Sequence, residues 1–150
     1  MLGMTNEQIL EFNREVIETF RSHDGVMPEG PFQGNPTLLL TMTGAKSGRQ
    51  LTTPLTYVAD DDGALIVMAS AGGSPKPPAW AHNLRTEPQV TVEVPGETYA
   101  AAAVETRGAE RARVFARMTE ALPRFAEYQH QVEREIPLFR LERDPSSIRG

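Results

Sequence analysis

The 150-residue chain contains no cysteine. Disulfide bonds, thiol nucleophiles and cysteine-ligated metals are therefore excluded, and the composition suits the reducing cytoplasm. The chain also lacks an apolar run of the roughly 20 residues that a membrane-spanning helix needs. Residues 1–10 show no apolar core of a signal peptide. We therefore expect a cytoplasmic protein without an integral membrane segment.

Positive charge is scarce as well. The chain has 15 lysines and arginines against 20 aspartates and glutamates, a net charge of −5. Without a basic stripe, we expect a small-molecule partner and no nucleic acid. The length predicts one domain, with a helix and loop over residues 1–36, a core over 37–142 and a polar tail over 143–150.

Several catalytic signatures are missing. The three histidines, His23, His82 and His130, are too scattered for a metal site. The chain has neither a Gly-x-Ser-x-Gly elbow nor a Gly-x-Gly-x-x-Gly fingerprint. If the protein is an enzyme, we expect a bound cofactor to supply the reactive group.

Residues 5–21 read as a helix with one apolar stripe. Its apolar residues recur at spacings of three and four: Ile9, Phe12, Val16 and Phe20. We expect the stripe to pack on the core. Peripheral membrane contact is the weaker alternative, because the polar face mixes glutamate with arginine.

The remaining periodicity alternates between strands and short helices. We expect strands over residues 38–43, 52–58, 64–69, 89–94, 97–106 and 136–141. Pro54 places the second of these at a sheet edge or a bulge. Helices are expected after Pro77-Pro78, over 109–122, and for a turn or two beyond Pro123. Short turns between consecutive strands favour an antiparallel α+β domain, a rolled sheet or small barrel.

The turn that follows the first strand, Thr43 to Arg49 (TGAKSGR), combines glycines with cations. Successive backbone N–H groups in such a turn can bind an anion, with Lys46 and Arg49 as additional positive charges. The spacing differs from that of a Walker A loop. The alternative is a solvated hairpin turn.

Residues 70–84 (SAGGSPKPPAWAHNL) hold two glycines, three prolines and the only tryptophan. Glycines at the end of a strand let a ligand approach the backbone, and a helix N-terminus suits an anion. Trp80 could stack on a flat ligand, and His82 and Asn83 add hydrogen-bonding groups. The alternatives are a tight connection with a buried Trp80, and a helix that ends at Asn83 and Leu84.

Phe125 and Tyr128 stand three residues apart, so one helix face can carry both rings. Core packing is the simpler interpretation. Tyr128 could also donate a hydrogen bond or a proton to a substrate.

Together, three segments resemble the deazaflavin-dependent nitroreductase and quinone reductase family. They are TMTGAKSGRQLTTPLTYV, MASAGGSPKPPAWAHNLRTEPQVTVEV and ALPRFAEYQHQVEREIPLFRLE, and the resemblance covers about residues 38–142. It implies a split β-barrel of about six antiparallel strands, with an N-terminal helix and flanking C-terminal helices. It also implies coenzyme F420, a deazaflavin with a phosphate and polyglutamate tail, as hydride donor to quinones, nitroaromatics or activated enones.

The resemblance assigns roles by position. The implied coenzyme contacts are Ala45, Lys46, Ser47, Arg49, Thr53, Pro54, Met68, Ala69, Ser70, Ala71, Ala79, Trp80, Ala81, His82 and Asn83. The implied substrate side consists of Thr56, Phe125 and Tyr128, with Tyr128 or solvent as proton donor. No metal is implied.

The chain departs from the family pattern at five positions. Ala45, Leu51 and Ala71 replace basic residues that many members carry, which removes cations from an anion pocket. Phe125 and Thr56 replace substrate-side tyrosines. Two other functions stay open at this point: an FMN-binding split-barrel oxidoreductase and a non-catalytic lipid-binding protein. Monomer and homodimer are both compatible with the sequence.

Overall fold

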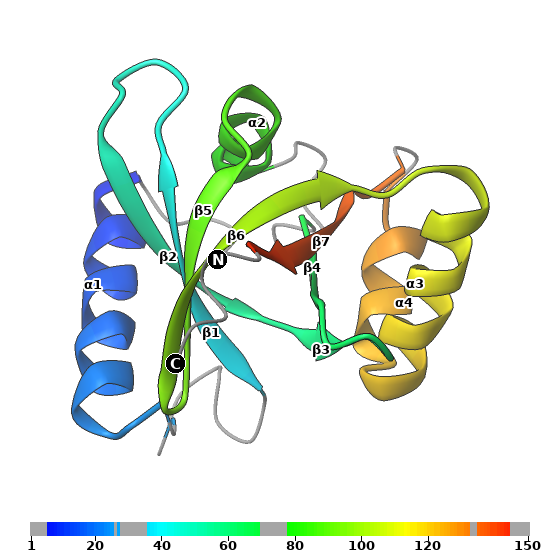
Figure 1. The fold of residues 1–150 in the computed structure, drawn as a ribbon, viewed down its shortest axis with the longest axis horizontal. Helices are drawn as coiled ribbons and strands as arrows, with labels where there is room; N and C mark the ends of the chain where they lie inside the picture. Colours follow the sequence, from blue (N-terminus) through cyan, green and yellow to red (C-terminus); the bar gives the residue numbers. More distant parts are fainter. Residues whose placement is uncertain (1–5, 26, 28–35, 70–77, 133–134, 145–150) are drawn as a thin grey trace.

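Within the residues that the computed structural model describes (6–25, 27, 36–69, 78–132 and 135–144), seven strands form one antiparallel sheet. The strands are β1 (Thr37–Thr43), β2 (Gln50–Thr56), β3 (Val58–Ala59), β4 (Leu65–Met68), β5 (Gln89–Val94), β6 (Glu97–Glu105) and β7 (Leu138–Arg143). The helices are α1 (Asn6–Ser22), α2 (Ala79–Thr86), α3 (Gly108–Ala121) and α4 (Arg124–His130). The sheet order is β2-β1-β5-β6-β7-β4-β3 (Figure 1).

The order of the strands forces the sheet to curl. β2 and β3 are the two edges of the sheet, yet Tyr57 alone separates them in the chain. In a flat sheet the two edge strands would be six strand spacings of about 4.8 Å apart, a distance that one residue cannot bridge. The curled half-barrel confirms the predicted split-barrel fold, and Pro54 lies in an edge strand as expected.

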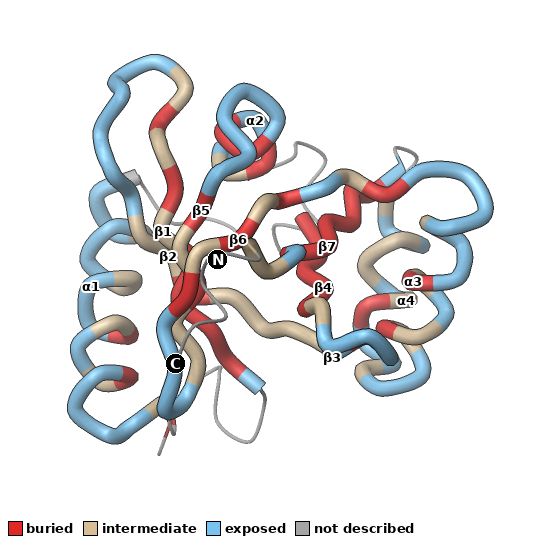
Figure 2. Tube along the Cα trace, in the orientation of Figure 1, coloured by how far each residue is buried: buried red, intermediate tan, exposed pale blue. Residues whose placement is uncertain are grey.

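The inner face of the curl holds the main core. Leu38, Leu40 and Met42 of β1 point into it, together with Phe139 of β7. α2 covers part of this core with Ala81 and Leu84. Buried stretches follow β4 and β7 through the middle of the molecule (Figure 2).

Both faces of β1 and β4 are buried, which explains their continuous apolar sequences. Leu39 of β1 faces outward under α1, where it packs with Phe12, Val16 and Phe20. The predicted packing of this stripe is confirmed for these three residues. Among the described residues, no helix is long and apolar enough to cross a membrane.

A third cluster lies between the outer face of β4 and β7 and the helix pair α3 and α4. Ile66 and Met68 of β4 pack there with Val114 and Met118 of α3. Figure 1 shows α3 and α4 at the opposite end of the molecule from α1. Each of the two outer clusters is therefore separate from the inner core.

Two strand predictions were wrong in their bounds. The run 52–58 is two strands, because the chain leaves one sheet edge at Thr56 and reaches the other at Val58; this raises the count from about six to seven. The last strand begins at Leu138 rather than at Ile136 and continues to Arg143. Pro137 cannot donate to a ladder, although its carbonyl accepts a hydrogen bond from Ala69 N–H at 2.9 Å.

A buried carboxylate fastens the outer helix pair to the sheet. The Asp60 side chain is 2% exposed and accepts two hydrogen bonds from Arg113 of α3, at 2.8 and 2.9 Å, and one from Arg140 of β7. The hydrogen bonds from the Arg113 guanidinium are the main cause that holds the pKa of Asp60 well below its usual range. The positive charge of Arg140 lowers this pKa further. The ionised carboxylate therefore stabilises the fold.

We expect Asp60→Asn to lower the free energy of unfolding near neutral pH by about 3 kcal/mol, because it removes the buried carboxylate that Arg113 and Arg140 share and leaves the buried Arg140 with the more exposed carboxylates of Asp62 and Glu142. The native pKa lies below the unfolded value of about 3.9, so the carboxylate contributes fully above about pH 4 and loses its contribution below it. The difference between wild type and variant should therefore shrink in denaturant titrations below about pH 4.

Asp61→Asn is the matched control. Its side chain is 80% exposed and pairs with Arg117 at 2.7 Å, so the expected loss is less than about 1 kcal/mol. Equal losses for the two variants would contradict the assigned role of Asp60.

Candidate functional site

The turn between β1 and β2, residues 44–49, is closed by its own backbone. Gly44 N–H donates to the Arg49 carbonyl at 2.8 Å, and Gly48 N–H donates to the Gly44 carbonyl at 2.9 Å. Arg49 N–H donates to Ser47 Oγ at 3.1 Å. Gly48 has a φ of 71°, in the left-handed region that favours glycine. The predicted turn therefore has a defined shape without any ligand.

Two adjacent amides of this turn are available. The N–H groups of Lys46 and Ser47 have no hydrogen-bond acceptor among the residues that the structure describes. The sequence suggested a longer run of free amides, but those of Gly44, Gly48 and Arg49 are used within the turn and that of Ala45 by a side chain of α2. The anion-binding capacity is thus concentrated on Lys46 and Ser47.

The charges on the turn are available too. Most described arginines pair with carboxylates, namely Arg14, Arg21, Arg85, Arg107, Arg111, Arg113, Arg117, Arg140 and Arg143. Lys46 and Arg49 are exposed and have no ion-pair partner within the described part of the chain. As far as the structure describes the chain, this acidic protein presents two unpaired cations beside two unpaired amides.

Asn83 of α2 connects the turn to the helix. Its Oδ1 accepts a hydrogen bond from Ala45 N–H at 2.9 Å, and its Nδ2 lies 3.7 Å from Met42 Sδ. Asn83 is only 9% exposed. The alternative that Asn83 ends the helix is wrong, because α2 continues to Thr86. This hydrogen bond was not predicted from the sequence. The available signal was the polar side chain of Asn83 between the buried apolar residues Ala81 and Leu84 of a short helix.

α2 begins after Pro78, as the sequence predicted, and presents two different faces. Ala81 and Leu84 are buried in the inner core, whereas Ala79 and His82 are exposed. Trp80 is half-buried, with its ring 6.0 Å from that of Phe139 at a tilt of 55°. Its indole is therefore partly packed on the core and partly accessible.

The predicted residues on β2 and β4 lie along the sheet. Thr53 and Thr56 are half-buried and Pro54 is buried, opposite Leu40, Thr37 and Leu39 of β1 respectively. Met68 and Ala69 are buried at the end of β4. Ser70 and Ala71 lie outside the described residues.

Phe125 and Tyr128 do share one side of α4, with ring centroids 5.4 Å apart. Phe125 is buried, and Tyr128 is half-buried against the same outer cluster that holds Met68. The structure therefore places the pair in packing contact with the sheet. A direct contact of either ring with a substrate stays a prediction.

The structure thus joins the turn and α2 directly, and Figure 1 shows them next to each other. The α4 pair does not join this group; it belongs to the separate outer cluster that also contains Met68. No group of acidic residues and histidines in the described ranges could hold a metal ion.

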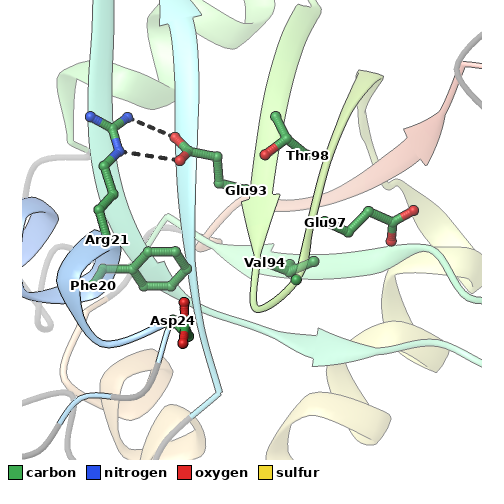
Figure 3. Close-up of a pocket in the computed structure, with 9 residues that line it drawn as sticks. Phe20, Arg21, Asp24, Glu93, Val94, Glu97 and Thr98 are labelled. Atoms are coloured by element: carbon green, nitrogen blue, oxygen red, sulfur yellow. Dashed lines mark hydrogen bonds and ion pairs between the residues drawn. The ribbon is translucent and has the colours of Figure 1, made fainter.

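Two hollows of the described surface lie away from these residues. One, of about 250 Å³, lies between the end of α1 and the β5–β6 turn (Figure 3). Its Arg21 donates to both oxygens of Glu93, at 2.8 and 3.2 Å. The other, of about 290 Å³, surrounds the Asp60 ion pairs. Each contains an ion pair that joins two elements of the fold, Arg21 with Glu93 in the first and Arg113 with Asp60 in the second.

Comparison with known proteins identifies the family of the chain. The model of a family described as F420H(2)-dependent quinone reductase matches residues 12–143. An F420H(2)-dependent quinone reductase of Mycobacterium tuberculosis is 40% identical over 141 residues, covering 85% of this chain and 91% of the relative.

Two solved structures extend the agreement to the fold. One, described as a domain-swapped dimer, is 35% identical with a TM-score of 0.68, covering 89% of this chain and 98% of that one. The other, an F420-H2 dependent reductase (FDR-A), is 39% identical with a TM-score of 0.66, covering 71% of this chain and 94% of that one. The family that the sequence resembles is confirmed: this chain belongs to the F420H(2)-dependent quinone reductase family.

Proposed function

We propose that this chain reduces a quinone with the reduced deazaflavin coenzyme F420H2. The observation that supports it most directly is the β1–β2 turn, where two free amides and two uncompensated cations stand together in a net acidic protein. The phosphate and polyglutamate tail of F420 is polyanionic, so this donor set suits it. The accessible part of Trp80 suits the flat ring of the same molecule.

The protein's own residues would bind, orient and shield. Lys46, Ser47 and Arg49 would hold the anionic end, and α2 would border the ring with Trp80. When bound, the reduced coenzyme supplies a hydride; the quinone gains that hydride and a proton, and F420H2 becomes F420 with release of a proton. We assign the proton to Tyr128 or to solvent, with Thr56 and Phe125 on the acceptor side. Positioning and exclusion of water would then account for the rate.

The replacement of basic residues by Ala45, Leu51 and Ala71 does not remove the proposed anion site. Ala45, where relatives often carry a cation, uses its backbone N–H to bond Asn83 rather than a ligand. Leu51 is 43% exposed next to the turn and offers an apolar surface instead of a charge. We therefore expect weaker and less salt-sensitive coenzyme binding than a fuller set of cations would give, because fewer ionic contacts remain for salt to screen.

Trp80 allows a direct binding test, because it is the only tryptophan. Titration of the protein with F420 should quench its fluorescence and saturate in the micromolar range, and F420H2 should then be oxidised on addition of a soluble quinone. Trp80→Phe is the control that removes the signal. Absence of quenching at tens of micromolar F420, or binding of FMN in its place, would refute the proposal. Native mass spectrometry of the purified protein tests the lipid-binding alternative, because it would reveal a co-purified lipid.

Lys46→Ala and Arg49→Ala test the charge argument. Each should raise the Kd for F420 about tenfold at low salt, and by less at high salt because an exposed ionic contact is screened. Arg14→Ala, which removes an exposed cation paired with Glu11 on α1, should leave the Kd unchanged. A salt-independent loss for Lys46→Ala, with a lowered melting temperature, would indicate damage to the fold instead.

We infer, further, that a second copy of this chain is its protein partner and that α1 is the element the copies exchange. Of the two terminal elements described, β7 lies between β6 and β4, so its removal would split the sheet. α1 instead packs in a separate outer cluster on Leu39, fastened by Arg21 to Glu93. The connection that follows, residues 23–36, has three glycines and three prolines and is long enough to reach a neighbour. The cytoplasm remains the proposed location.

Charge reversal tests the exchange. Arg21→Glu and Glu93→Arg each place like charges together within one chain, whereas a swapped heterodimer of the two variants restores both opposite-charge pairs. After mixing through unfolding and refolding, native mass spectrometry should show the heterodimer in excess over either homodimer. A mixture that contains only monomers would exclude the exchange.

A further inference from the structure

The proposed coenzyme site is built from two segments distant in sequence, and one buried side chain connects them. The turn 44–49 carries the cations and α2 carries Trp80. Asn83 of α2 accepts from Ala45 N–H at 2.9 Å, across 38 positions of sequence. Within the described residues, this is the only hydrogen bond between α2 and the turn.

The surroundings of Asn83 make this hydrogen bond specific. The residue is 9% exposed, its helix neighbours Ala81 and Leu84 are buried in the core, and its Nδ2 lies 3.7 Å from Met42 Sδ. An amide satisfies the backbone donor of Ala45 without placing a charge in the core. A leucine of similar volume would leave that N–H unpaired, and an aspartate would bring a negative charge next to a proposed anion site.

The position of the bond within the turn also matters. Ala45 directly precedes Lys46 and Ser47, whose free N–H groups are the proposed contacts for the anion. Holding Ala45 fixes the start of this pair relative to Trp80 on α2. The turn's internal hydrogen bonds set its shape, but they do not set where it stands against the helix.

We propose that Asn83 is a positioning residue that docks the β1–β2 turn on α2, so that the anion-binding amides and Trp80 can act on one ligand. It does so through Ala45 and makes no coenzyme contact with its side-chain oxygen. The expected effect of Asn83 on coenzyme binding rests on the proposed function. The docking itself is a property of the free protein.

Asn83→Leu tests the consequence. It should raise the Kd for F420 and the KM for F420H2 by about ten- to hundredfold, since a misplaced pair of amides weakens ground-state binding, while kcat changes by less than about threefold. Thr86→Ala is the matched control, because it removes a side-chain hydrogen bond to His82 on the same helix, with no link to the turn. An unchanged Kd, or a fall in kcat with KM unchanged, would overturn the positioning role.

Hydrogen exchange in the protein without coenzyme tests the docking independently. Exchange of the Ala45 amide should become at least tenfold faster in Asn83→Leu, with the amides of β5 and β6 unchanged. Asn83→Asp keeps the acceptor, so Ala45 should stay protected while F420 binding weakens in a salt-dependent way. Unchanged Ala45 exchange in Asn83→Leu would refute the docking, whereas changed exchange in a protein that binds no F420 would refute only the proposed function. Should Asn83→Leu fail to fold, the Asp variant decides: fast Ala45 exchange there contradicts the proposal.

Discussion

A single residue between the two edges of the sheet constrains the whole molecule. Because Tyr57 alone connects β2 to β3, the seven described strands must curl until their edges approach. The curl produces an inner face with one continuous core and an outer face that helices must cover. β7 then closes the arrangement between β6 and β4. Without β7, the last described strand, β6 and β4 would not be joined and the sheet would be in two parts.

The same curl determines where the functional groups can stand. The β1–β2 turn projects from one edge, and α2 lies on the inner core next to it, with Ala81 and Leu84 buried below. The buried side of α2 holds the helix in place, while Trp80 and His82 remain partly or wholly exposed. The proposed site therefore combines a helix anchored in the core with an exposed face, which a large ligand with a charged tail requires.

The charges around the outer helices are arranged differently from the charges at the β1–β2 turn. Around the outer helices, arginines and carboxylates form pairs: Arg21 with Glu93 at α1, and Arg113 and Arg140 with Asp60 at α3 and the sheet. These pairs join elements whose apolar clusters are small. At the turn, Lys46 and Arg49 have no acidic partner among the described residues. An excess of acidic residues over the whole chain is thus compatible with a local site for an anion.

The sequence by itself determined much of this protein, because periodicity and turn chemistry are local. The stripe of Phe12, Val16 and Phe20, the glycines at 44 and 48, and the helix start after Pro78 were all predictable. The family was identified separately, from three longer segments within residues 38–142. Only the tertiary structure decided the rest. The break at Tyr57 depends on where the two sheet edges meet, the packing of Phe125 depends on α3 and β4, and the partner of Asn83 lies 38 residues away. Contacts of that kind arise from how the chain closes in space, and no pattern within a short stretch of residues encodes them.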